Sequence, residues 1–203
     1  EGSIRNHLEH PPILRYAGWS LETLDQAKIM RGEMIRVANG DRKVIDLYRD
    51  GTLVFVGLAN HKFLAWGNSP EKQKINSVAI VEIIYSFVNF YKLVLIDFKT
   101  SPKEINVRVD FKNMHLDGIK NYLLPYAVNT YAQMFDDDKK EATDDNGMFI
   151  KSFQTKDYDI AIIAYDIVKE VYLWFGQEED KIPYVKTENG LKMVDINAIK
   201  GNK

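Results

Sequence analysis

The dipeptide Asp50-Gly51 sets the strongest constraint on the fold, because it separates two runs rich in β-branched residues, at 42–48 and 52–57. A tight hairpin turn needs positive φ angles, which Gly and Asp tolerate and β-branched residues do not. Residues 43–56 are therefore predicted to form an antiparallel hairpin with its turn at Asp50-Gly51. A third strand is expected at 62–66, which would make this sheet a β-meander.

A long apolar helix is predicted to follow at residues 70–92, with Ser69-Pro70 supplying an N-cap and a first helical residue. Its polar residues Glu82, Ser86 and Asn89 are spaced by four and then three, so they form one narrow stripe on an otherwise apolar surface. We expect this helix to be buried on most sides and to pack across the sheet.

Residues 104–112 alternate between polar and apolar side chains, which is the period-two pattern of a half-buried strand. The apolar set runs from Ile105 through Val107 and Val109 to Phe111. This strand is expected to join the sheet of the meander after the long helix.

The second half is predicted to be rich in helices. Short helices are expected at 116–124 and 126–135, a long helix at 157–175 ending before Gly176, and a final hairpin between 182 and 196. The predicted fold class is thus α+β, an antiparallel β-meander with a packed long helix and a further strand, followed by this helix-rich half.

Two segments of different character divide the chain. Residues 1–41 contain Pro11-Pro12 and are predicted to be a linker and lead-in segment, pinned to the surface by apolar residues such as Leu14 and Trp19. Residues 42–203 are expected to form a single α+β domain, with sub-lobes at 42–114 and 115–203 as the alternative division.

Composition excludes several classes of chemistry. The chain has no cysteine, which removes disulfides, thiol catalysis and cysteine metal sites. Its longest apolar stretch is broken by polar residues such as Glu82 and Lys92, so no membrane span is predicted. We expect a cytoplasmic protein, since no signal segment is visible at the start.

No catalytic motif is present among the glycines, serines and histidines. The twelve glycines form neither a dinucleotide-binding nor a phosphate-cradling loop, and no serine has the Gly-x-Ser-x-Gly context of a nucleophile elbow. We therefore expect no cofactor and no enzyme activity of this chain's own.

Glu82 is the carboxylate of greatest interest, because it lies in the middle of the apolar helix. If it is buried, its pKa should be raised, as it is in many general acids. The alternative is that the polar stripe faces water, or that Glu82 caps a strand edge by a hydrogen bond, with Ser86 as a local partner.

Asp136, Asp137 and Asp138 open the densest acidic segment, which extends to Asp145. Carboxylate oxygens are the ligands that Mg²⁺ and Ca²⁺ prefer. The spacing is not that of an EF-hand, so a metal site here is set against a solvated charged loop.

Five basic residues are candidate contacts to nucleic acid: Arg42, Lys43, Arg49, Arg108 and Lys112. The alternative is a solvated face of mixed charge, because Glu104 and Asp110 share a strand face with Arg108 and Lys112. A formal net charge of −2 gives the chain no general attraction to phosphate backbones.

Four segments carry a family resemblance. Residues 42–55, with their Tyr-Arg-Asp-Gly hairpin, 75–87, 106–114 and 164–176 resemble the region downstream of the Schlafen/AlbA-type DNA-binding domain of bacterial proteins. This resemblance implies a nucleic-acid-related or defence-related setting, with the AlbA-type domain preceding this chain, and it implies no site residue within it.

Three functions follow in order of preference. The first is a non-catalytic accessory or interaction domain of a larger protein, whose partner is another protein or a covalently linked N-terminal domain. The second is direct nucleic-acid binding through the five basic residues. The third is a metal-dependent hydrolase or nuclease using Asp136, Asp137 and Asp138. The sequence leaves the oligomeric state open.

Overall fold

The computed structural model describes residues 2–23, 25–30, 34–65, 74–97, 102–116, 118–124 and 140–201. The helices are α1 (Gly2–Glu9), α2 (Ser77–Asp97), α3 (Ile160–Trp174) and α4 (Ile196–Gly201), with short 3-10 turns η3 (Thr155–Asp157) and η4 (Glu179–Lys181). The longer strands are β2 (Met34–Asn39), β3 (Lys43–Tyr48), β4 (Leu53–Gly57), β6 (Glu104–Phe111), β11 (Gly147–Gln154), β12 (Val185–Glu188) and β13 (Leu191–Val194). The shorter ones are β1 (Lys28–Met30), β5 (Lys74–Asn76), β7 (His115–Leu116), β8 (Ile119–Lys120), β9 (Tyr122–Leu124) and β10 (Lys140–Glu141). The predicted α+β class is confirmed.

The predicted hairpin is present as β3 and β4, which pair antiparallel with Leu47 opposite Leu53. Gly51 adopts a φ of +89°, the left-handed conformation that made glycine the signal for this turn. The sheet has four antiparallel strands in the order β1-β2-β3-β4. The expected third strand at 62–66 was wrong, because residues 62–65 form turns and the additional strands lie upstream.

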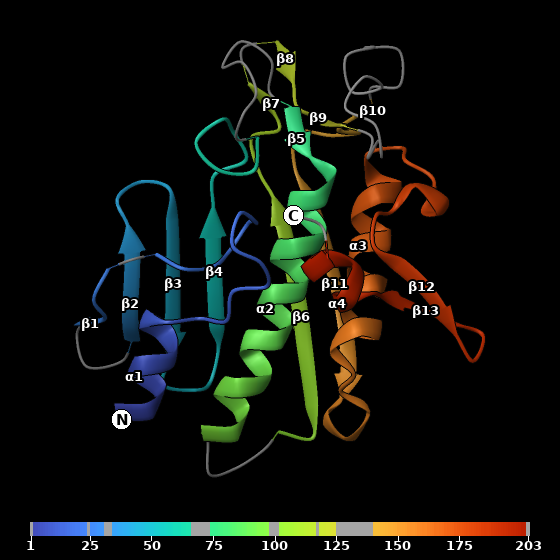
Figure 1. The fold of residues 1–203 in the computed structure, drawn as a ribbon. Coiled ribbons are helices and arrows are strands. Elements are labelled where there is room, and N and C mark those ends of the chain that lie inside the picture. The colour runs from blue at the N-terminus through green and yellow to red at the C-terminus, as the bar shows by residue number, and fades with distance from the viewer. Residues whose placement is uncertain are drawn as a thin grey trace.

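Residues 1–41 differ from the expected linker, since they contribute α1, β1 and β2 to the fold (Figure 1). The side chains of Leu8, Leu21 and Val37 are fully buried in the core. Pro11-Pro12 marks only the end of α1, where the chain turns toward the pocket described below.

Helix α2 is the centre of the fold, and most of its residues are buried, as predicted. It begins at Ser77 rather than residue 70, because residues 74–76 form β5, which pairs in parallel with β9. The capping signal at Ser69-Pro70 lies outside the described residues. In the described part of the chain only α2 is long and apolar enough to cross a membrane, but 61% of that stretch is buried in the fold, as in the core helix of a soluble protein.

Strand β6 has the predicted alternation, with Ile105, Val107 and Phe111 buried. The expectation that it joins the meander was wrong, because β6 pairs along its full length with β11 in a separate two-stranded sheet. β11 carries Met148 and Ile150 on its exposed side, so its sequence lacks the alternation that marked β6.

In the second half, the long helix and the final hairpin are confirmed as α3 and β12–β13. The short helix expected at 116–124 was wrong, because β7, β8 and β9 occupy that segment; 126–135 lies outside the described residues. Helix α3 packs against α2, and the buried hydroxyl of Tyr172 donates a 3.1 Å hydrogen bond to the carbonyl of Ser77. Figure 1 shows α2 lying between the four-stranded sheet and α3.

Candidate binding pocket

A buried carboxylate on α2 fixes the segment that follows α1. Glu82 has no exposed surface, and its Oε1 accepts a 2.8 Å hydrogen bond from Nε of Arg15. Its Oε2 accepts a second bond of 2.8 Å from the backbone amide of Trp19. Both carboxylate oxygens are therefore committed to residues 15–19, which we call the clasp segment.

Glycine is required within the clasp segment because the chain passes so close to Glu82. A Cβ atom built on Gly18 would lie 2.5 Å from Oε2 of Glu82 and 2.7 Å from Cγ of Arg15. Real Cβ contacts are not that short, so any larger residue at position 18 would displace either the clasp segment or the side chains of Glu82 and Arg15.

Burial raises the pKa of Glu82, while the hydrogen bonds from Arg15 and Trp19 and the charge of Arg15 oppose that rise. Glu82 thus faces neither water nor a strand edge but the clasp segment, and of the three residues of the polar stripe only Asn89 is partly exposed. Ser86 is not the partner of Glu82, since its buried hydroxyl has no hydrogen-bond partner among the residues that the structure describes. The sequence identified Glu82 as unusual but could not identify a partner 67 positions away.

The clasp segment forms one wall of a pocket of about 230 Å³. The opposite walls come from the turn between β2 and β3 and from residues 62–63 after β4. The pocket is lined by Ala17, Gly18, Trp19, Ser20, Asn39, Arg42, Lys43, Lys62 and Phe63. Three of these nine residues are cations and none is a carboxylate, so the cavity favours an anionic group.

Two of the three cations are held by protein groups. Lys43 donates from Nζ to the backbone carbonyls of Ser20, at 3.0 Å, and Glu22, and its Nζ lies 5.3 Å from the ring centroid of Phe63. Burial lowers the pKa of Lys43. Lys62 donates a 2.7 Å bond to Oδ2 of Asp41, whose pKa this bond lowers.

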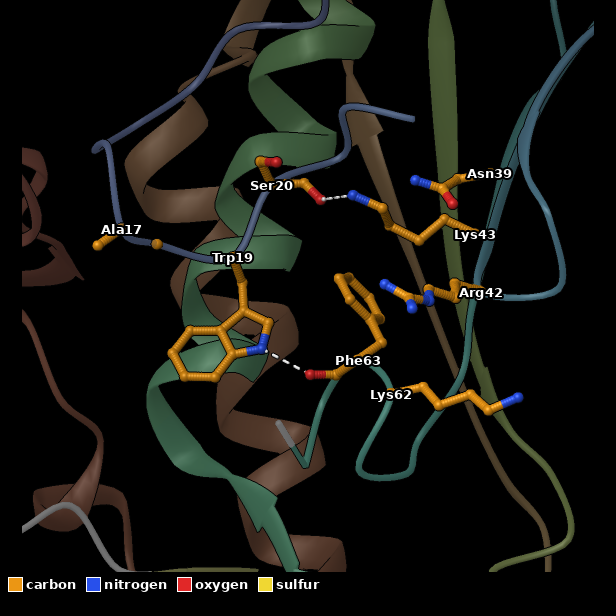
Figure 2. A pocket seen from close by; sticks show the side chains of 9 residues that line it. Ala17, Trp19, Ser20, Asn39, Arg42, Lys43, Lys62 and Phe63 are labelled. Carbon is orange, nitrogen blue, oxygen red and sulfur yellow. Dashed lines mark hydrogen bonds between the residues drawn. The ribbon is translucent and has the colours of Figure 1, made fainter. Parts of the chain in front are cut away.

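Arg42 differs from these two, because its exposed guanidinium makes no hydrogen bond or ion pair with any residue in the described part of the chain. Figure 2 shows Arg42 at the cavity, with Lys43 reaching the carbonyl of Ser20 and the Trp19 indole donating to the carbonyl of Phe63, a bond of 2.8 Å. Arg42 therefore has free donors for a ligand, and its planar group suits a carboxylate or a phosphate.

The other predicted basic residues lie elsewhere. Arg49 is in the turn at the far end of β3, roughly 20 Å of strand from Arg42. Arg108 on β6 donates to both oxygens of Asp110, at 2.8 and 3.0 Å, as the mixed-charge alternative anticipated. Lys112 is exposed just after β6. Of the five basic residues predicted to contact nucleic acid, only Arg42 and Lys43 therefore lie together in this pocket.

The predicted acidic triplet Asp136, Asp137 and Asp138 lies outside the described residues. Within those residues, no group of three or more His, Asp or Glu side chains could hold a metal ion. Glu170, the acidic residue of α3, pairs with Lys151 at 3.4 Å.

Seven of the nine pocket residues were not identified from the sequence as parts of a site: Ala17, Gly18, Trp19, Ser20, Asn39, Lys62 and Phe63. All but Asn39, the last residue of β2, come from turns or irregular segments, where no periodicity marks the side that faces a cavity. Lys62 had one local signal, its position directly after the turn residues Asn60-His61.

Comparison with known proteins gives no relative for this fold or site. No protein-family model matches the chain, and no curated protein or solved structure is significantly similar to it.

Proposed function

We propose that this chain is a non-catalytic interaction domain of a larger cytoplasmic protein, and that its pocket holds a carboxylate from an acidic segment of a protein partner. The larger protein belongs, in this proposal, to the nucleic-acid-related or defence-related setting that the Schlafen/AlbA resemblance implies. The partner is a separate protein or a domain linked to this chain.

The observation that carries the proposal is the charge of the pocket lining. The lining contains Arg42, Lys43 and Lys62 and no acidic residue, although the whole chain has a net charge of −2. Because Lys62 is paired with Asp41 just outside the lining, the positive charge of the pocket comes mainly from Arg42 and Lys43. Such local concentration of one sign in a concave site attracts the opposite charge. Because Lys43 and Lys62 are already bonded, Arg42 is the residue that would contact the ligand directly.

A protein carboxylate fits this arrangement better than nucleic acid does. Nucleic-acid affinity comes mainly from many phosphate contacts along a backbone, which requires a track of cations. Here Arg108 is neutralised by Asp110 and Arg49 lies at the other end of β3, so the basic residues form one small site instead of a track.

Catalysis is not part of the proposal. The pocket lining contains one hydroxyl, that of Ser20, but no His, Asp or Glu that could act as its base. Glu82, the buried carboxylate behind the pocket wall, is engaged at both oxygens by the clasp segment.

The test is a fluorescence anisotropy titration with a labelled eight-residue peptide of Asp and Glu. Its isosteric Asn/Gln peptide, a single-stranded oligonucleotide and a duplex serve as the comparison ligands. The variant Arg42→Gln removes the proposed contact, and Arg49→Gln is the matched control, because it removes the same charge from the same sheet outside the pocket.

The proposal predicts salt-sensitive binding of the acidic peptide that Arg42→Gln weakens by about tenfold, the usual value of a charge-assisted contact. Arg49→Gln should change the Kd by less than about twofold. Tighter binding of an oligonucleotide than of the peptide, or equal losses in the two variants, would contradict the proposal.

A further inference from the structure

The clasp segment, which forms one wall of the pocket, is held in place by a carboxylate that has no exposed surface. A carboxylate is an unusual group to find fully buried in a protein core. Glu82 lies among apolar neighbours on α2 and is compensated by Arg15 and the Trp19 amide alone in the described contacts. Burying a charge is costly, and apolar side chains of similar size usually pack as well in its place. Packing alone therefore does not explain an ionisable residue at position 82.

The position of the two bonds gives a better explanation. Arg15 and Trp19 flank the residues that line the pocket from this side, Ala17 and Gly18, and Trp19 itself is part of the lining. Arg15 and Trp19 donate two hydrogen bonds of 2.8 Å to one carboxylate on α2, and these bonds fix the wall at two points. Directional bonds fix a backbone more sharply than apolar contacts do.

We infer that Glu82 is the positioning residue of the pocket: it sets the wall formed by the clasp segment, and so the distance between that wall and Arg42, without touching the ligand. This inference rests on the proposed function, because it concerns how the same pocket is kept in its binding shape. We therefore expect that removing the charge of Glu82 weakens ligand binding while the fold remains intact.

Glutamine is the informative replacement. It keeps the size of Glu82 but has one acceptor oxygen, so its amide group must face either Nε of Arg15 or the amide of Trp19. Two donors then oppose each other, and one end of the wall loses its bond. Arg15 is the only charged group that contacts Glu82 in the described structure, and it would be left without this carboxylate.

A matched control is available on the same sheet as the pocket. Asp46 is also a buried carboxylate, and both its oxygens accept 2.7 Å bonds from Arg36. It lies on β3 next to Ile45 and Leu47, whose side chains face the core, so Asp46 points to the opposite face of the sheet. Asp46→Asn therefore removes a buried carboxylate from its ion pair with the partly exposed Arg36, without touching the pocket.

The experiment measures the Kd of the acidic peptide for the wild-type chain, Glu82→Gln and Asp46→Asn, at a temperature where circular dichroism shows all three to be folded. In parallel, ¹⁹F NMR of 5-fluorotryptophan chains follows Trp19, whose signal is assigned with Trp19→Phe. Glu82→Gln should weaken binding about tenfold and shift the Trp19 signal but not that of Trp174, whereas Asp46→Asn should do neither.

The two proposals fail in different ways. If the wild-type chain does not bind the peptide, the proposed function fails. If the wild-type chain binds and Glu82→Gln binds equally well, or if Asp46→Asn weakens binding as much as Glu82→Gln does, then Glu82 has no positioning role. An unchanged Trp19 signal in Glu82→Gln would overturn the inference even if affinity fell.

Discussion

Nε of Arg15 donates a 2.8 Å hydrogen bond to Oε1 of Glu82, which joins the segment after α1 to the middle of the core helix across 67 residues of sequence. The Trp19 amide binds the other oxygen at the same distance. Since this clasp is buried and directional, changes around it should have effects that differ from those of ordinary core substitutions.

Gly18→Ala should destabilise the chain, because its Cβ would lie 2.5 Å from Oε2 of Glu82. Either the clasp segment or the buried side chains of Glu82 and Arg15 would have to move, at a cost of about 1–3 kcal/mol in the free energy of unfolding. Gly201→Ala is the control: a Cβ there has no neighbour within 4 Å, and we expect a change of less than about 0.5 kcal/mol. Urea denaturation of the two variants makes the comparison, and equal stabilities would contradict the close approach.

The stability difference between the wild-type chain and Glu82→Gln should depend on pH in a defined direction. Burial raises the pKa of Glu82 above its ordinary value of 4.5, so folding favours the protonated form. The stabilisation that comes from this raised pKa is thus fully present at pH values below the pKa of Glu82 in the unfolded chain. It is lost as the pH rises through the pKa of Glu82 in the folded chain. Urea denaturation from pH 4 to pH 8 should show the wild type losing stability relative to the variant as pH rises; the opposite trend would refute the assignment.

Glu179 should show the reverse dependence. Hydrogen bonds from Lys169, Lys192 and Tyr165 lower its pKa to about 2. Its stabilising contribution is present above the ordinary pKa of 4.5 and is lost as pH falls from there toward 2. The melting temperature should therefore change less between pH 2 and pH 6 for Glu179→Gln than for the wild-type chain. Parallel profiles would show that these bonds do not form in solution.

The contact between the two long helices gives a prediction about packing. Tyr172 is buried, and its hydroxyl donates to the carbonyl of Ser77 at 3.1 Å. Tyr172→Phe keeps the ring and should cost about 1 kcal/mol of unfolding free energy, the usual net value of such a bond. Phe90→Ala, which empties a fully buried site on α2, should cost about 3–5 kcal/mol. Guanidinium denaturation compares them, and a larger loss for Tyr172→Phe would contradict this packing.

Local signals predicted the elements that local chemistry determines. The Asp50-Gly51 turn, the alternation in β6 and the end of α3 at Gly176 all depend on residues a few positions apart, and all three are confirmed. The sheets could not be assigned in the same way. The partner of β6 is β11, whose exposed Met148 and Ile150 hide its period, and β5 displaces the start of α2 through its pairing with β9.

The site was predictable only in part, for the same reason. Arg42 and Lys43 were identified as candidate contacts, but their separation from Arg49, Arg108 and Lys112 follows from strand direction and sheet membership. Glu82 was marked by its position among apolar residues in the middle of the helix, which left its burial open. Its clasp with Arg15 and Trp19 depends on a chain path that no local pattern encodes.

The central claim, that the pocket binds an anionic group through Arg42, is tested most directly by NMR of the arginine side chains. The Nε–Hε signals of a ¹⁵N-labelled chain are followed during titration with the acidic peptide, and those of Arg42 and Arg49 are assigned with Arg42→Lys and Arg49→Lys. The account predicts that the Arg42 signal moves in a saturable way with the Kd found by anisotropy, while the Arg49 and Arg108 signals stay in place. A saturable shift of Arg49 or Arg108 with an unmoved Arg42 signal would contradict it.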